Sequence, residues 1–250
     1  MMNKMSNFGR LVVGISGASC TGKTTLTKLL RATFPWSSVV HQDAYYHPND
    51  PKYHVYLPDV KHFNWDAKTA VDFTKMEKDL QTLLTSECSR TTQIKIDEKL
   101  LHFPNDHFVK KHQPNENEIQ YLSSRFSRIP LTILEGHIVF SHPQFFRLCN
   151  LKYFLRLDQA ELFSRRRSRV YDPPNPPGYL EKYVWPAYVS RLEEIKELQG
   201  IHYFDAKSVP LVDIFHQIKQ SITLEMASMI SPTPTTVEDS NIKETISRRG

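Results

Sequence analysis

The chain has 250 residues, of which 40% are hydrophobic and 24% charged, and these proportions are ordinary for a globular protein with one main domain. No stretch approaches the roughly 18 apolar residues of a membrane span, and the N-terminus lacks an apolar segment of signal-peptide length, so a cytoplasmic location is expected, with the nucleus as the alternative. The net charge of +5 includes an arginine cluster at residues 165–169, which an anionic nucleotide explains better than a nucleic acid does.

The most specific motif lies close to the N-terminus. Residues 17–24 read GASCTGKT and match the phosphate-binding pattern G-x-x-x-x-G-K-[ST], between a predicted buried strand at residues 11–16 and a predicted helix. Glycines let the backbone curl around phosphate oxygens, and its N–H groups then point inward together with the positive end of the helix. We expect Lys23 to reach the β- and γ-phosphates and the Thr24 hydroxyl to ligate Mg²⁺. The alternative is a glycine turn that binds nothing. If the loop binds a nucleotide, the expected contact residues are Gly17, Ala18, Ser19, Cys20, Thr21, Gly22, Lys23, Thr24 and Thr25.

A second short strand is predicted at residues 37–41, and it places Asp43 just beyond its carboxyl end. Ligands bind at this edge of open α/β sheets, so Asp43 is a candidate to accept a proton from an acceptor hydroxyl or to help hold Mg²⁺. An acid that serves only a turn or a helix cap is the alternative. Residues 45–63 are rich in proline, tyrosine and histidine and predict a long loop, which in a compact enzyme is more often functional than idle.

A helix is predicted from residue 67 to about residue 85, opened by Asn64-Trp65-Asp66. Asp66 is then a candidate helix cap and Trp65 a candidate core residue. Residues 86–128 are polar and are interpreted as an insertion, partly a hairpin or a short helix. Neither the histidines of this insertion nor the cysteines of the chain have the spacing of a metal site or a disulfide framework: His102, His107, His112, Cys20, Cys88 and Cys149.

Two further buried strands are predicted at residues 131–134 and 152–157. The first ends in Glu135, which is either an acid near Mg²⁺ or a structural hydrogen-bond acceptor. The second is followed by Asp158, a candidate N-cap for a helix that carries the arginine cluster. Together with the proline-rich turn after it, this helix predicts a lid over residues 158–178.

The remaining sequence continues the alternation of helices and strands. A helix is predicted at residues 179–198, where Pro186 should kink it or start a new segment. A last strand near residues 202–204 and a final helix at residues 211–229 follow. Residues 231–250 have no apolar period and are predicted to be a disordered tail.

The alternation of strands and helices predicts a parallel sheet covered on both faces, so the expected fold is a three-layer α/β sandwich of the P-loop kinase type over residues 10–228. The N-K-x-D and D-x-x-G motifs of GTPases are absent, and no features of an ATPase motor are evident. A small-molecule kinase remains, in which an acid meets the acceptor hydroxyl and an arginine-rich lid covers the phosphates. A solvated basic surface is the alternative for the arginines. The expected catalytic residues are Lys23, Asp43 and Arg166, and the expected Mg²⁺ residues are Thr24, Asp43 and Glu135.

Several motifs together resemble the nicotinamide riboside kinases, which belong to the uridine kinase-like group of P-loop kinases. The resemblance spans roughly residues 10–228, and its most discriminating part runs from the arginine cluster to Val184-Trp185-Pro186. The other motifs are the phosphate loop, Gln42-Asp43, Asn64-Trp65-Asp66, Glu135-Gly136, Arg169-Val170-Tyr171, Pro173-Pro174 and Pro177-Gly178-Tyr179.

This resemblance implies transfer of the γ-phosphate of ATP, with Mg²⁺, to the ribose 5′-hydroxyl of nicotinamide riboside in NAD biosynthesis. It implies that Asp43 accepts the proton, that Asp66 holds ribose hydroxyls, and that Trp65 and Tyr171 sandwich the cationic base, a contact worth about 0.5–2 kcal/mol per ring. Further substrate contacts are expected from Tyr45, Tyr46, Arg167 and Asp172, and further nucleotide contacts from Arg166, Arg169, Ala206 and Lys207.

The chain also departs from the family pattern. Ala44 stands where many members carry a second consecutive acid, and Asn175 stands where an acid is often found. The alternatives are a uridine or other nucleoside kinase and a nucleotide-binding regulator without catalysis. The sequence leaves open the choice between nicotinamide riboside and nicotinic acid riboside, between ATP and GTP, and among oligomeric states.

Overall fold

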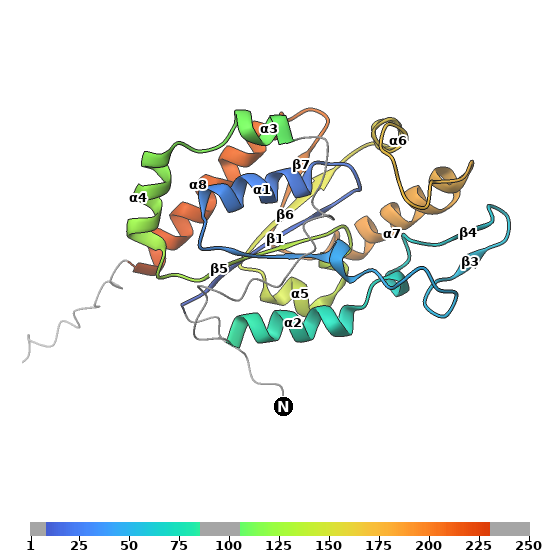
Figure 1. Cartoon of the computed structure of the whole chain (residues 1–250), viewed down its shortest axis with the longest axis horizontal. Helices are drawn as coiled ribbons and strands as arrows, with labels where there is room; N and C mark the ends of the chain where they lie inside the picture. Colours follow the sequence, from blue (N-terminus) through green and yellow to red (C-terminus); the bar gives the residue numbers. More distant parts are fainter. Residues whose placement is uncertain (1–8, 86–105, 231–250) are drawn as a thin grey trace, which may run out of the picture.

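The computed structural model describes residues 9–85 and 106–230, and at its centre lies a five-stranded sheet (Figure 1). All strand pairs of this sheet are parallel, and the strand order is β2-β5-β1-β6-β7. Strand β1 occupies the middle, and all seven of its residues are buried, as a strand covered on both faces requires. The strands are β1 (Leu11–Gly17), β2 (Ser38–His41), β5 (Leu131–Glu135), β6 (Leu151–Arg156) and β7 (Ile201–Asp205).

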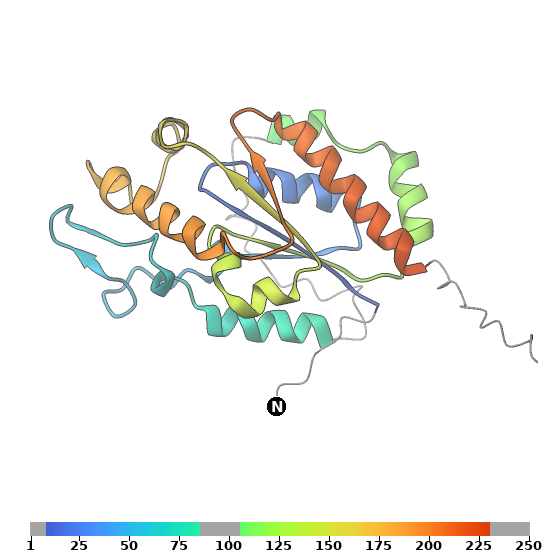
Figure 2. The same ribbon diagram turned by 180° about the vertical axis from the view of Figure 1, so that it is seen from behind.

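Helices cover both faces of this sheet, so the predicted three-layer α/β fold is confirmed. Figures 1 and 2 show one group of helices above the sheet and another below it. The upper group is α1 (Lys23–Thr33), α3 (Asp106–Lys111), α4 (Glu116–Phe126) and α8 (Leu211–Ile230). The lower group is α2 (Phe73–Thr85) and α5 (Pro143–Leu148), of which the sequence analysis did not predict α5.

The carboxyl ends of the strands point toward the segments that the sequence analysis connected with function. Helix α6 (Gln159–Arg167) follows β6, and its N-cap is Asp158, whose Oδ1 accepts the Glu161 N–H at 2.8 Å, as predicted. One turn of π-helix (Leu180–Val184) precedes α7 (Trp185–Ile195), so Pro186 falls in the first turn of a new helix. The same end of the molecule carries the hairpin β3 (Tyr56–Leu57) and β4 (His62–Phe63), within the segment predicted to be a loop (Figure 1).

The prediction that a helix begins at residue 67 is wrong. Residues Lys68–Ala70 form a single 3-10 turn, and α2 begins at Phe73. The cap is Asp72, whose Oδ1 accepts the Lys75 N–H at 2.9 Å. Asp66 cannot cap a helix because an arginine and a tyrosine from other elements occupy its carboxylate, as described below.

Other predictions fall partly or wholly outside the described residues. Of the insertion at 86–128, the residues from 106 onward form α3 and α4, whereas residues 86–105, with Cys88 and His102, lie outside them. The predicted tail at 231–250 also lies outside. Over residues 9–85 and 106–230, none of the helices combines the length and the apolar character needed to cross a membrane.

Candidate active site

The phosphate loop connects β1 to α1, and glycine is required at both of its ends. Gly17 has a φ of +139°, and a Cβ there would lie 2.2 Å from the carbonyl oxygen of Leu155. Gly22 is the residue before α1 and has a φ of +91°, a left-handed conformation that side chains disfavour. Within the loop, Lys23 Nζ and Thr21 Oγ1 both donate to the Ala18 carbonyl oxygen, at 2.7 and 2.9 Å. The loop therefore holds a buried ammonium group at the N-terminus of a helix, where anions are stabilised.

Two acidic residues and a hydroxyl group lie beside this loop because parallel strands end at the same edge of the sheet. His41 and Glu135 are partners in the register of β2 and β5. Glu135 Oε2 lies 2.7 Å from His41 Nδ1, and its two carboxylate oxygens lie 3.4 and 3.5 Å from Thr24 Oγ1. The sequence analysis did not single out His41, although its position directly before Gln42-Asp43 at a strand end was a usable signal.

The pKa values of Glu135 and of nearby Asp43 are shifted in opposite directions. Burial acts to raise the pKa of Glu135, but the hydrogen bond from His41 and the positive charges of His41 and Lys23 outweigh it and lower that pKa. Desolvation by the surrounding protein and the like charge of Glu135 raise the pKa of Asp43, whereas the positive charge of Lys23 acts to lower it. Because the Asp43 residue is largely exposed, repulsion from Glu135 raises this pKa more than desolvation does. Asp43 is therefore the stronger base of the two.

These groups fit a magnesium ion shared with phosphates. Thr24, Asp43 and Glu135 offer hard oxygen ligands, and Mg²⁺ is usually held by one or two carboxylates together with substrate phosphates. Over residues 9–85 and 106–230, no group of three or more His, Cys, Asp and Glu side chains could hold a metal without such help.

A buried ion pair joins α6 to the segment that precedes α2. Arg166 donates to both carboxylate oxygens of Asp66, at 3.2 and 3.0 Å, and the Tyr179 hydroxyl donates to Asp66 Oδ2 at 3.0 Å. Arg191 donates to the Asp66 backbone carbonyl. Burial acts to raise the pKa of Asp66, but the charge of Arg166 outweighs it and holds the pKa at about 2. Two residues predicted to act on different groups, Asp66 on ribose and Arg166 on phosphate, are thus direct partners.

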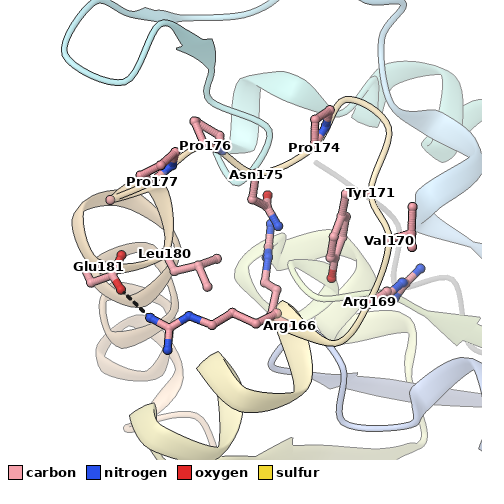
Figure 3. Close-up of a pocket in the computed structure, with 12 residues that line it drawn as sticks. Arg166, Arg169, Val170, Tyr171, Pro174, Asn175, Pro176, Pro177, Leu180 and Glu181 are labelled. Atoms are coloured by element: carbon pink, nitrogen blue, oxygen red, sulfur yellow. Dashed lines mark hydrogen bonds and ion pairs between the residues drawn. The ribbon is translucent and has the colours of Figure 1, made fainter.

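The predicted lid contacts the phosphate loop through Tyr171. The Tyr171 hydroxyl lies 3.3 Å from Ser19 Oγ and 3.2 Å from Cys20 Sγ. Its ring lies between two guanidinium groups, with the Cζ atoms of Arg166 and Arg169 at 4.9 and 5.1 Å from the ring centroid (Figure 3). A pocket of about 580 Å³ opens beside this ring and is lined by the arginines and by the proline-rich turn.

The base sandwich expected between Trp65 and Tyr171 stays a prediction, because a base held between the two rings would keep them out of direct contact. The Trp65 ring lies 4.2 Å from the His54 ring and 5.9 Å from the Tyr46 ring, measured between centroids. Two arginine side chains contact the Tyr171 ring, because a guanidinium is a favourable partner for an aromatic face. Trp65 is half-buried and contacts aromatic neighbours, so it is not a fully buried core residue.

The other predicted substrate contacts fare differently. Tyr46 lies at the site, as described below, whereas the Tyr45 ring is buried against α2, with Lys75 Nζ 5.0 Å from its centroid. We therefore no longer assign a substrate contact to Tyr45. Arg167 is exposed and its guanidinium donates to Glu181 Oε1 at 2.8 Å, so it is paired with a surface acid and we expect no substrate contact from it. Asp172 is exposed in the turn that follows Tyr171.

The predicted nucleotide contacts after β7 lie at the outer edge of the loop. Arg165 Nη2 donates to the Ala206 carbonyl at 2.9 Å, and its Nη1 reaches the Cys20 carbonyl at 3.5 Å. Arg165 therefore ties the phosphate loop to the end of β7. Lys207 is exposed, and its Nζ donates to Asp158 Oδ2 at 2.7 Å, so its ammonium group faces an acid on the protein surface.

Sequence reasoning also missed a polar chain formed by Gln42, His137 and Tyr46. Gln42 Nε2 lies 2.9 Å from His137 Nδ1, and His137 Nε2 lies 3.4 Å from the Tyr46 hydroxyl. Burial and the charge of Arg191 lower the pKa of His137 well below its usual value, so this ring is neutral. His137 directly follows Glu135-Gly136 at a strand end, and that position was the signal that could have identified it.

Comparison with known proteins supports the nucleoside kinase interpretation. No model of a known protein family matches the chain. Nicotinamide riboside kinase 1 of Mus musculus is 26% identical over 218 residues, which cover 87% of this chain and 96% of that protein. Nicotinamide riboside kinase 2 of Mus musculus is 29% identical over 85% of this chain and 95% of its own length, and the Saccharomyces cerevisiae nicotinamide riboside kinase is 29% identical over 71% and 75%.

Solved structures are more distant. A possible uridine kinase from Bacillus stearothermophilus is 16% identical, with a TM-score of 0.42, over 79% of this chain and 91% of that chain. The two mouse nicotinamide riboside kinases, in contrast, match over 87% and 85% of this chain. The resemblance to the nicotinamide riboside kinases that the motifs predict is therefore confirmed along most of the chain.

Proposed function

We propose that this protein transfers the γ-phosphoryl group of ATP to the 5′-hydroxyl of nicotinamide riboside, which yields the mononucleotide used in NAD biosynthesis. The observation that carries the proposal is the position of Asp43, an exposed carboxylate with a raised pKa beside a complete phosphate loop. Nicotinamide riboside kinases that match along most of the chain support the choice of acceptor.

In the proposed mechanism the chain supplies positioning and charge. The N–H groups of the loop and Lys23 bind the β- and γ-phosphates, while Thr24, Asp43 and Glu135 are the residues that would hold Mg²⁺. Bound Mg²⁺ supplies charge neutralisation on the phosphate oxygens. Asp43 accepts the 5′-hydroxyl proton as the new P–O bond forms, and the bond between the γ-phosphorus and the β–γ bridging oxygen breaks to release ADP. Arg169, across the Tyr171 ring from Arg166, stabilises the negative charge on the transferred group.

The aromatic side chains favour a cationic acceptor over a neutral nucleoside. Trp65, His54 and Tyr46 form a cluster on the acceptor side, and a permanently charged pyridinium ring gains about 0.5–2 kcal/mol from each good aromatic contact. Uracil has no charge and gains no such energy. A uridine or other nucleoside kinase is the second candidate, and a nucleotide-binding protein without catalysis is the third.

A panel of acceptors distinguishes these candidates. ADP release is measured with Mg²⁺ and ATP in the presence of nicotinamide riboside, nicotinic acid riboside, uridine or pantothenate, with Lys23→Ala as the control for contaminating ATPase. We expect turnover of nicotinamide riboside, with a product of the mass of its mononucleotide. Turnover of uridine or pantothenate alone would reject the proposal, and ATP binding without ADP release for any acceptor would identify the third candidate.

A further inference from the structure

Gln42 anchors a chain of hydrogen bonds that leads to Tyr46. Its Oε1 accepts the Ile138 backbone N–H at 2.8 Å, which leaves Nε2 to face His137 Nδ1 at 2.9 Å. Gly136 makes this approach possible, because a Cβ at that position would lie 2.3 Å from the Cβ of Gln42. The contacts of Gln42 on both sides therefore fix the orientation of its amide.

This orientation determines where the protons lie along the chain. An amide nitrogen only donates, so His137 Nδ1 must accept from Gln42 Nε2, and the N–H of the ring lies on Nε2. The Nε2–H then points to the Tyr46 hydroxyl oxygen, 3.4 Å away. Tyr46 accepts this hydrogen bond, so its own O–H is left to donate, and within residues 9–85 and 106–230 the hydroxyl has no second hydrogen-bond partner.

Tyr46 lies between His137 and Trp65, three residues after Asp43, and Trp65 directly precedes Asp66. Its ring stands edge-on to Trp65 at 5.9 Å, and both Tyr46 and His137 are partly exposed. Burial, and after it the negative charges of Asp43 and Asp66, raise the pKa of Tyr46 well above its usual value, so the phenol keeps its proton. A sugar hydroxyl matches such surroundings, because it can donate to a carboxylate and still accept from a phenol.

We propose that the Tyr46 hydroxyl donates a hydrogen bond to a ribose hydroxyl of the acceptor, and that Gln42 and His137 are positioning residues that hold Tyr46 as a donor. The inference rests on the proposed function, since it assigns the contact to the acceptor riboside. It makes Tyr46 a residue that selects acceptors by their sugar hydroxyl groups, separately from the recognition of the base by aromatic rings.

Two variants test the contact. Tyr46→Phe removes the hydroxyl and keeps the ring, and His137→Phe removes the donor to Tyr46 and keeps an aromatic ring. Each should raise KM for the riboside about 3- to 10-fold and leave KM for ATP unchanged, since one neutral hydrogen bond is lost. The matched control is His142→Phe, because His142 is also partly buried and packs on Phe73 and Phe145, at 5.0 and 4.3 Å, away from the site.

The chain of hydrogen bonds from Gln42 to Tyr46 predicts that the effects of substituting His137 and Tyr46 are coupled. A merely structural role of His137 would not give this coupling. The double variant Tyr46→Phe/His137→Phe should be no worse than either single variant, because both remove the same hydrogen bond. His137→Gln, which returns an amide donor, should recover part of the lost affinity. Additive effects of the two substitutions, or no recovery in His137→Gln, would contradict the positioning role of His137.

Deoxy analogues of the riboside identify the sugar hydroxyl that Tyr46 contacts. They also make the test independent of whether the His137 variants fold. Tyr46→Phe should lose its effect with either the 2′-deoxy or the 3′-deoxy riboside, whichever lacks the contacted hydroxyl. An equal loss with all three ribosides, or a KM like that of His142→Phe, overturns the inference. The acceptor is whichever riboside the wild-type protein phosphorylates, so failure of nicotinamide riboside as a substrate would show in the wild type and not only in the variants.

Discussion

The proposed donor side and the proposed acceptor side of the site are built in different ways. The donor side comes from one continuous stretch, residues 17–24, in which Lys23 and Thr21 both bond to Ala18. On the proposed acceptor side, Asp43, Asp66, His137 and Arg166 come from four separate segments, and Asp66 and Arg166 form an ion pair with each other. The phosphate loop thus carries its function in its own backbone, whereas the acceptor side depends on partners that only the fold brings together.

The largest expected effect separates chemistry from binding. Asp43→Asn should reduce turnover about 10²- to 10⁴-fold, because it removes the proton acceptor, while the affinity for ATP changes little. Lys23→Ala, on the donor side, should weaken both turnover and ATP binding. Steady-state kinetics together with calorimetric ATP titration measure both quantities. If Asp43→Asn keeps its turnover, Asp43 is not the base.

The next effect concerns the stability of the acceptor side. Asp66→Leu should lower the free energy of unfolding by about 3–5 kcal/mol, since it leaves the charge of Arg166 buried without its partner. The double variant Asp66→Leu/Arg166→Met should be less destabilised than this single variant, because no unpaired charge remains. Urea unfolding followed by tryptophan fluorescence measures both. A double variant that is as unstable as the sum of its single variants would show that the pair is not coupled.

The same pair predicts a pH dependence of stability. The pKa of Asp66 is about 2 in the folded protein, below its usual value of 3.8, so the unfolded chain takes up the proton first as the pH falls. The stabilisation is complete above pH 4 and should be lost between pH 4 and pH 2, and the difference between the two pKa values corresponds to about 2 kcal/mol. Unfolding free energies of the wild type and Asp66→Asn at pH 6, 4 and 3 should therefore converge toward acid. A constant difference across this range would contradict the assignment.

The smallest expected effect on stability and activity is that of substituting Arg167, the residue next to this pair in the sequence. Arg167 directly follows Arg166, but its pair with Glu181 is exposed. Arg167→Ala should change the free energy of unfolding by less than about 1 kcal/mol and leave KM for the riboside unchanged, because exposed ion pairs are screened by water and salt. Arg166→Ala is the matched comparison. A large loss of turnover in Arg167→Ala would instead support the contact between Arg167 and the substrate that the sequence predicts.

Prediction from the sequence succeeded where the signal was local. The phosphate loop follows from the spacing of its glycines and from Lys23, and the alternation of apolar strands and helices gives the three-layer fold. The N-cap role of Asp158 and the new helix at Pro186 follow from the chemistry of single residues, whose partners lie a few positions away. These features depend on backbone geometry, which a short stretch of sequence sets by itself.

Prediction failed where a side chain had a choice of partners. Asp66 has the residue type and position of a helix cap, but a buried carboxylate gains more from the Arg166 guanidinium than from backbone N–H groups, and α2 begins at Phe73 instead. Tyr45 and Tyr46 are neighbours of the same type, yet one packs on α2 and the other faces the site. Nothing in the local pattern distinguishes them.

By itself the sequence determined the donor chemistry, the fold class and the family resemblance, because contiguous residues with fixed spacing carry all three. Only the tertiary structure decided that Glu135 is held by His41, that Asp66 is paired with Arg166, and that Gln42 orients His137 toward Tyr46. The physical reason is that a buried polar group must find a partner, and the partner is set by which strand ends and loops converge at one edge of the sheet.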